Sequence, residues 1–285
     1  MAFVIIQIAA TVAIVVLVAL HVRASRRHWQ PEVWAGEMGL ELTPSNEIIV
    51  RSYLERTRTL RTAGAVAGLI APFAYQALTG GPLPRPFDFG LLDALTGYLV
   101  GVVVAEVSFR RPNAPVRQAS LVPRRLRDYL PPHLTIAVRV LAAVDLLVFA
   151  LYQLMPPAPG RAKDVVLLPV WIMVPMVLAI AVLVELLQRS IVGRAQPAVR
   201  TDIERADDAI RSASVHALAG AGIALLLVIL GVELVAIASI SETEAVRSIL
   251  PWAGLVCLIA ALRAWIRVGR PSRWRVRRQV PGAAG

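Results

Sequence analysis

Two carboxylates stand inside long apolar runs of the sequence, where ionisable side chains are rare. Asp145 lies in the stretch RVLAAVDLLVFALYQL, which begins at Arg139, and Glu233 lies in the apolar run over residues 213–239. An ionisable residue inside a membrane segment marks an ion or proton path, or a polar partner in a neighbouring helix. Asp145 and Glu233 are therefore the first candidates for chemistry in this chain.

Asp145 is predicted to lie near the centre of a membrane helix. It follows the predicted start of that helix, at Leu134, by about 16 Å at a rise of 1.5 Å per residue. An aspartate at this depth costs about 2.5–3.5 kcal/mol on insertion scales, so we expect it to face the helix bundle in a neutral or hydrogen-bonded form, with Tyr98 as a candidate partner. Two hypotheses stay open: a proton or cation path through Asp145 and Glu233, and a buried hydrogen bond between helices.

Four further charges lie at one common depth, about 6–8 Å inside the predicted cytoplasmic ends of their spans. They are Glu106, Arg139, Glu185 and Arg263. Two acids and two bases at the same depth predict ion pairs across helices, with Glu106 paired to Arg139 and Glu185 to Arg263. Such pairs would either brace neighbouring helices or form a cytoplasmic gate.

Cysteine and histidine do not have the number or spacing of a metal site. The single cysteine, Cys257, lies in an apolar run, which is typical of a small core residue. The four histidines carry neither HxxxH nor HExxH spacing, and all map to the predicted cytoplasmic interface: His21, His28, His133 and His216. We predict no metal and no other cofactor; a metal site shared by the histidines is the alternative.

Recognisable catalytic motifs are also missing from the sequence. It contains no GxxxxGK[ST] loop for nucleotide phosphates and no Ser–His spacing typical of a rhomboid-type protease. The only lysine, Lys163, lies in a predicted outer loop, which excludes a retinal Schiff base in the last span. These patterns favour a protein that is not an enzyme, and no catalytic residue is predicted.

Membrane helices are the elements that must position these residues. The 285 residues are 57% hydrophobic and 17% charged, with a mean hydropathy of +0.64, whereas soluble domains carry about 25% charge. The apolar residues gather in runs of about 20, the length that crosses a bilayer. The predicted fold class is all-α: a polytopic membrane helix bundle of about seven transmembrane helices in one domain, residues 1–285. The predicted spans are 2–21, 62–79, 91–109, 134–155, 165–187, 213–239 and 249–266.

The distribution of arginine predicts the orientation. Residues 22–61, 110–133 and 188–212, together with the tail 267–285, hold 24 of the 30 basic residues, and the opposite loops hold four. Loops rich in Lys and Arg stay cytoplasmic, so the N-terminus is predicted to lie outside and the C-terminus inside. The net charge of +11 thus lies beside the spans, where it serves orientation or contact with anionic lipid headgroups rather than nucleic acid.

Two of the cytoplasmic segments are predicted to begin long helices. Thr43 can cap a helix whose first residue is Pro44, and Thr201 with Glu204 forms a capping box for a helix over about 202–239. Each helix leads into a span rich in small residues, which leaves open an arrangement of parallel repeats. Tight helix packing explains the same pattern.

Glycines four residues apart predict close contact between the second and third spans. They are Gly64 and Gly68 in one span and Gly97 and Gly101 in the other. This small-residue spacing lets helix backbones approach each other in a membrane. We interpret the four glycines as packing positions.

Two stretches carry a resemblance to other proteins. RSYLERTRTLRTAGAVAGLIAP, from residue 51, and ADDAIRSASVHALAGAGIALLL, from residue 206, resemble segments of uncharacterised actinobacterial multi-spanning integral membrane proteins. The resemblance implies a bacterial source and the cell membrane as compartment. It carries over no catalytic residue.

The sequence thus predicts a multi-pass protein of the plasma membrane. Its expected function is that of a transporter-like bundle or of the membrane partner of another complex. The alternatives are an intramembrane enzyme and a membrane scaffold that recruits cytoplasmic proteins or anionic lipid through its basic face. The expected partners are the lipid bilayer, anionic headgroups at the cytoplasmic face and another protein, with no nucleic acid.

Overall fold

The structure is a computed structural model that describes residues 30–79, 91–108, 125–160, 170–194 and 201–268. These residues form α-helices and one 3-10 helix, η2 (Leu126–Asp128), and they contain no strand. They fall into two compact units. The predicted first span and most of the loop 110–133 lie outside the described residues, as does nearly all of the basic tail.

The first unit contains three helices and the beginning of a fourth. These are α2 (Pro31–Met38), α3 (Pro44–Thr79), α4 (Leu91–Ser108) and residues 201–210 of α7 (Thr201–Ile240). The predicted start of α3 is confirmed. The amide of Asn46 donates to the Oγ1 of Thr43 at 3.3 Å, and the amide of Thr43 donates to the Oδ1 of Asn46 at 2.9 Å. These reciprocal bonds satisfy two donors at the helix N-terminus.

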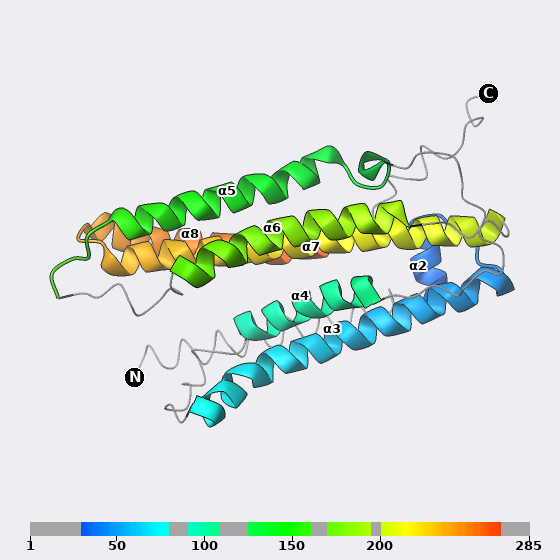
Figure 1. Cartoon of the computed structure of the whole chain (residues 1–285), viewed down its shortest axis with the longest axis horizontal. Helices are drawn as coiled ribbons and strands as arrows, with labels where there is room; N and C mark the ends of the chain where they lie inside the picture. The colour runs from blue at the N-terminus through cyan, green and yellow to red at the C-terminus, as the bar shows by residue number, and fades with distance from the viewer. Residues whose placement is uncertain (1–29, 80–90, 109–124, 161–169, 195–200, 269–285) are drawn as a thin grey trace. The chain divides into compact units, whose positions relative to one another are not determined.

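Glycine determines how α3 and α4 pack. A Cβ atom on Gly64 would overlap the carbonyl oxygen of Gly97, and one on Gly68 would overlap the carbonyl oxygen of Asp93. Because the contact moves down α4 as it moves up α3, the two helices are antiparallel, and they lie side by side in Figure 1. Backbone-to-backbone contact of this kind leaves no room for any side chain.

The second unit contains α5 (Pro132–Leu154), α6 (Val170–Gly193), the rest of α7 and α8 (Glu244–Val268), together with η2. Its core is apolar and is built by three of these helices. Val138 and Phe149 of α5, Val177 and Val184 of α6, and Leu226 of α7 belong to one buried cluster. A second cluster joins the end of α5 to α7 and α8.

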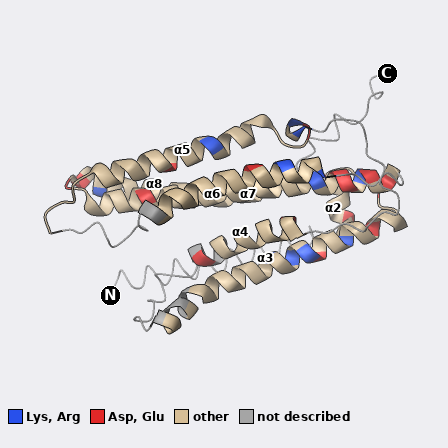
Figure 2. Ribbon diagram, in the orientation of Figure 1, with Lys and Arg blue, Asp and Glu red and all other residues tan. Residues whose placement is uncertain are grey.

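The outside of this second unit is apolar as well. Large hydrophobic side chains are exposed on α5, α6 and α8, among them Leu147, Val182 and Val256. Soluble monomers rarely expose apolar surface on this scale. Charged residues gather at the start of α7 and in the first half of α3, and long uncharged stretches follow them (Figure 2). This distribution suits helices that are surrounded by lipid.

Four described helices are long and apolar enough to cross a membrane: α5, α6, α7 and α8. They correspond to the last four predicted spans. The helix α6 extends beyond its predicted span, to Gly193, whereas α7 at Thr201–Ile240 agrees with the helix predicted over about 202–239. The segment 188–212, predicted as a loop, is helical over 188–193 and 201–212. The predicted second and third spans fall on α3 and α4, which are not among the four; within α4, residues 96–108 form a shorter apolar stretch.

Candidate functional site

Asp145 is positioned by the stripe of α5 that faces the core. The buried residues of this helix are Val138, Ala142, Asp145, Phe149 and Tyr152. They are three or four residues apart, which places them on one side of a helix. Asp145 is 0% exposed, so its carboxyl group faces the interior of the unit. The carboxyl group therefore takes a core position that the rest of the stripe gives to apolar and aromatic residues.

Glu233 holds the same kind of position on α7. It is 0% exposed, and Ile229, Ala236, Ile237 and Ile240, which are three to seven residues away along the helix, are also buried. About seven residues separate Glu233 from the end of α7, which corresponds to about 10 Å. A second carboxyl group is thus enclosed by the apolar interior of the same unit.

The two carboxyl groups lie in neighbouring parts of one core. Ala142 of α5 and Ile229 of α7 belong to one buried cluster, and Tyr152 of α5 and Ala236 of α7 belong to the next. The α7–α8 contact nearby is narrow, since a Cβ on Gly231 would lie 3.0 Å from the carbonyl oxygen of Gly254. The tertiary structure therefore brings together two acids that are 88 residues apart in the sequence (145 to 233).

Neither carboxyl group has a hydrogen-bond partner among the residues that the structure describes. Tyr98, the candidate partner of Asp145, belongs to the first unit, and this hydrogen bond stays a prediction. A buried polar group without a partner costs about 1–3 kcal/mol, and a buried charge costs far more. Enclosure without a cation therefore favours the protonated form of both carboxyl groups.

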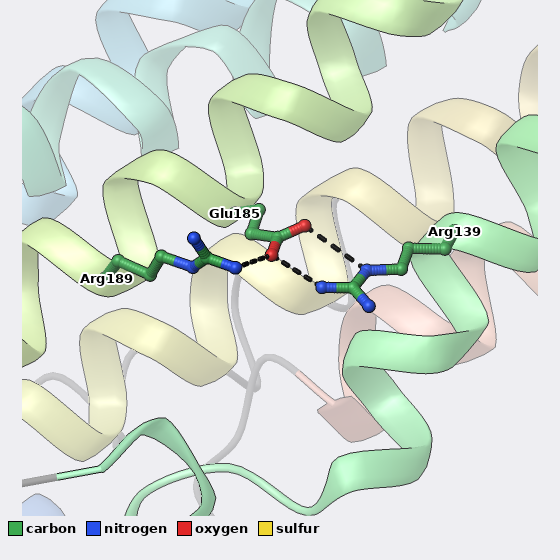
Figure 3. Close-up of polar contacts among 3 residues, drawn as sticks. All are labelled: Arg139, Glu185 and Arg189. Atoms are coloured by element: carbon green, nitrogen blue, oxygen red, sulfur yellow. Dashed lines mark hydrogen bonds and ion pairs between the residues drawn. The ribbon is translucent and has the colours of Figure 1, made fainter.

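Arg139, Glu185 and Arg189 form a charged cluster on α5 and α6 (Figure 3). Arg139 donates to both carboxylate oxygens of Glu185, through Nε at 3.2 Å and through a terminal nitrogen at 2.5 Å. Arg189, one turn after Glu185, donates to the same Oε1. The predicted pair Glu185–Arg263 is wrong, because Glu185 binds Arg139 and Arg189 instead. Glu106 and Arg139 belong to different units, and their predicted pair stays a prediction.

Glu106 has its own partners in the first unit. The hydroxyl of Tyr53 donates to its Oε1 at 3.0 Å, and Arg61 forms an ion pair with the same oxygen at 3.7 Å. Glu106 is 1% exposed, so the pair with Arg61 links α3 and α4 inside the unit. Arg263 lies on the exposed side of α8.

Arg211 is a buried cation that sequence reasoning did not select. It is 0% exposed, and one terminal nitrogen donates to the carbonyl oxygens of Ile191, Val192 and Arg194 at 2.7–3.1 Å. These carbonyls lie at the C-terminal end of α6 and just after it, where the helix supplies no further N–H donors. Arg211 of α7 therefore caps the end of α6. In the structure, Arg211 lies within an unbroken run of buried residues, 209–224.

The two described histidines lie far from the carboxyl pair. His133 begins α5, about 18 Å along the helix from Asp145, and His216 precedes Glu233 on α7 by about 25 Å. The Nδ1 of His216 lies 2.8 Å from the carbonyl oxygen of Ser212. In the described part of the chain, no three His, Cys, Asp or Glu side chains are close enough to hold a metal ion together. His21 and His28 lie outside the described residues.

Comparisons of the chain with protein-family models, with curated proteins and with solved structures give no match.

Proposed function

We propose that the chain is a multi-pass protein of the plasma membrane, with seven spans in one transmembrane domain, its N-terminus outside and its C-terminus in the cytoplasm. Two observations support this topology. Four described helices have the length and composition of membrane spans, and 24 of 30 basic residues fall in segments that an alternating topology places on one side. A bacterial, actinobacterial source is part of the same proposal.

Cysteine accessibility tests the topology. In a Cys257→Ala background, single cysteines at Ser120 and Ser272 are expected to react with a membrane-impermeant maleimide only after the cells are opened, because both sites lie in basic segments. A cysteine at Glu242, in the short turn between α7 and α8, is the control that is expected to react in intact cells. Reaction of position 120 or 272 in intact cells would contradict the orientation.

For the function we propose a transporter-like bundle in which Asp145 and Glu233 carry protons. The single observation that carries this proposal is the pair of fully buried carboxyl groups without a described hydrogen-bond partner, on two helices of the second unit. An ionisable residue inside a membrane segment is a functional-site hypothesis by default, because its burial is costly. Two of them in one helix core offer successive positions for one proton.

The chemistry follows from the surroundings of each acid. In the enclosed state, the charged form of either carboxyl is disfavoured by desolvation, and a negative charge on one disfavours a charge on the other. A proton therefore leaves only when water or a cationic solute reaches the pair. This condition would couple proton release to opening of the bundle on one side, which is the requirement for proton-coupled transport.

Proton flux into proteoliposomes tests this function. With a proton gradient and an internal pH-sensitive dye, we expect the wild-type protein to move protons and Asp145→Asn to reduce the rate at least tenfold, since the amide keeps the shape and polarity but binds no transferable proton. Glu233→Gln is expected to act in the same way. Glu242→Gln, which changes an exposed acid in the turn after α7, is the matched control and should retain the wild-type rate.

A spectroscopic measurement separates protonation from transport. Infrared difference spectra between wild-type protein and Asp145→Asn are expected to show the loss of a protonated carboxyl C=O band at neutral pH. Loss of a carboxylate band instead would contradict the neutral form. A protonated band combined with identical flux in all variants would reject transport and favour the role of a membrane partner for another complex.

A further inference from the structure

The charged cluster of Arg139, Glu185 and Arg189 carries an excess of positive charge at the surface. Two guanidinium groups share one carboxylate, so the cluster has a net charge of +1. The side chains of Arg139 and Arg189 are 57% and 65% exposed, whereas that of Glu185 is 24% exposed. Each arginine thus keeps N–H donors directed away from the carboxylate that holds it (Figure 3).

Both arginines stand beside an exposed apolar stripe. On α6, Leu178, Val182 and Leu186 are exposed at three- and four-residue intervals that lead to Arg189. On α5, exposed apolar residues surround and follow Arg139 in the same way: Ile136, Val140, Leu147 and Leu151. Side chains at these intervals share one face of a helix. An apolar surface therefore runs along each helix with a cation beside it.

We propose that this surface binds an anionic glycerophospholipid, with its phosphate between Arg139 and Arg189 and its acyl chains along the apolar stripes of α5 and α6. Guanidinium groups present N–H donors in a planar fork that matches the oxygens of a phosphate. One phosphodiester carries a charge of −1, which neutralises the net charge of the cluster. A zwitterionic lipid adds a cation to a cluster that is already positive, because the single negative charge of Glu185 is shared by both arginines.

Glu185 is the positioning residue of this site. Its bonds to Arg139 and Arg189 hold two long side chains from different helices in one arrangement before the lipid arrives. Arginine side chains have large rotamer freedom, and ordering them in advance lowers the entropy cost of binding. The site is therefore specific to the α5–α6 pair and differs from a loose attraction between basic loops and the membrane surface.

Native mass spectrometry of the delipidated full-length protein tests the proposal. We expect phosphatidylglycerol to bind more tightly than phosphatidylcholine. Arg139→Gln and Arg189→Gln should each weaken phosphatidylglycerol binding about fivefold, and the double variant about twenty-five-fold, from about 1 kcal/mol per basic residue near anionic lipid. Arg51→Gln is the matched control, because it removes an arginine that forms another exposed i,i+4 pair, with Glu47, and should leave binding unchanged.

Three outcomes would overturn the lipid site. They are equal binding of phosphatidylglycerol and phosphatidylcholine, an equal loss in Arg51→Gln, and displacement of the lipid by millimolar inorganic phosphate, which would indicate a site for free anions. If a glutamine variant fails to fold, the double substitution Arg139→Lys and Arg189→Lys replaces it. That variant keeps both charges but loses the planar forks, so it should bind with intermediate affinity, and wild-type affinity there would contradict the proposed geometry.

Discussion

Replacing Gly64 or Gly97 by alanine is expected to separate α3 from α4. A Cβ atom on either glycine would overlap a carbonyl oxygen of the other helix, and a backbone atom cannot move aside as a side chain can. The helices must shift apart along their whole contact, so the cost should reach or exceed the 1–3 kcal/mol that is typical of overpacking. The effect is measured as the free energy of unfolding in detergent micelles and as the hydrogen-exchange rates of the α3 and α4 amides.

Gly36 provides the matched control for this prediction. It lies in α2 of the same unit, and a Cβ added there meets nothing within 4 Å. Gly36→Ala should therefore be neutral or slightly stabilising, because alanine favours a helix over glycine by up to about 1 kcal/mol. If Gly64→Ala and Gly36→Ala gave the same stability and the same amide exchange, close backbone contact between α3 and α4 would be refuted.

Replacing Arg211 by methionine is expected to destabilise the second unit by about 1.5–3 kcal/mol, the range for losing buried hydrogen bonds to a charged group. Methionine fills a similar volume but donates no hydrogen bond, so the carbonyls of Ile191, Val192 and Arg194 would lose a shared donor. The last turn of α6 should fray first. The free energy of unfolding and the amide exchange rates at the end of α6 measure both effects.

Two further variants show whether the hydrogen bonds of Arg211 are responsible. Arg205→Met changes an exposed arginine on the same helix and should alter stability by less than about 0.5 kcal/mol, as surface substitutions usually do. Arg211→Lys keeps the charge on a shorter, more compact donor group, and it should recover part of the lost stability. Equal stability of wild-type protein and Arg211→Met would show that α6 ends without this cap.

The sequence alone determined the helices of the second unit and the starts of α3 and α7. Apolar runs and capping residues are local properties, so the predicted span 134–155 agrees with α5 at Pro132–Leu154, and the predicted helix 202–239 agrees with α7 at Thr201–Ile240. The inward direction of Asp145 was also predictable. The energetic cost of a carboxylate facing lipid is independent of which helices surround it.

Only the tertiary structure decided which side chains meet. Position along a helix gives the depth of a charge but neither the rotation of the helix nor its neighbour, and so Glu185 was expected to pair with Arg263 yet binds Arg139 and Arg189. The burial of Arg211 depends on the end of α6, 17 to 20 residues earlier in the chain. Likewise, Asp145 and Glu233 lie in the same core because α5 and α7 pack together. Such contacts depend on how several helices fill space together, which local sequence patterns do not specify.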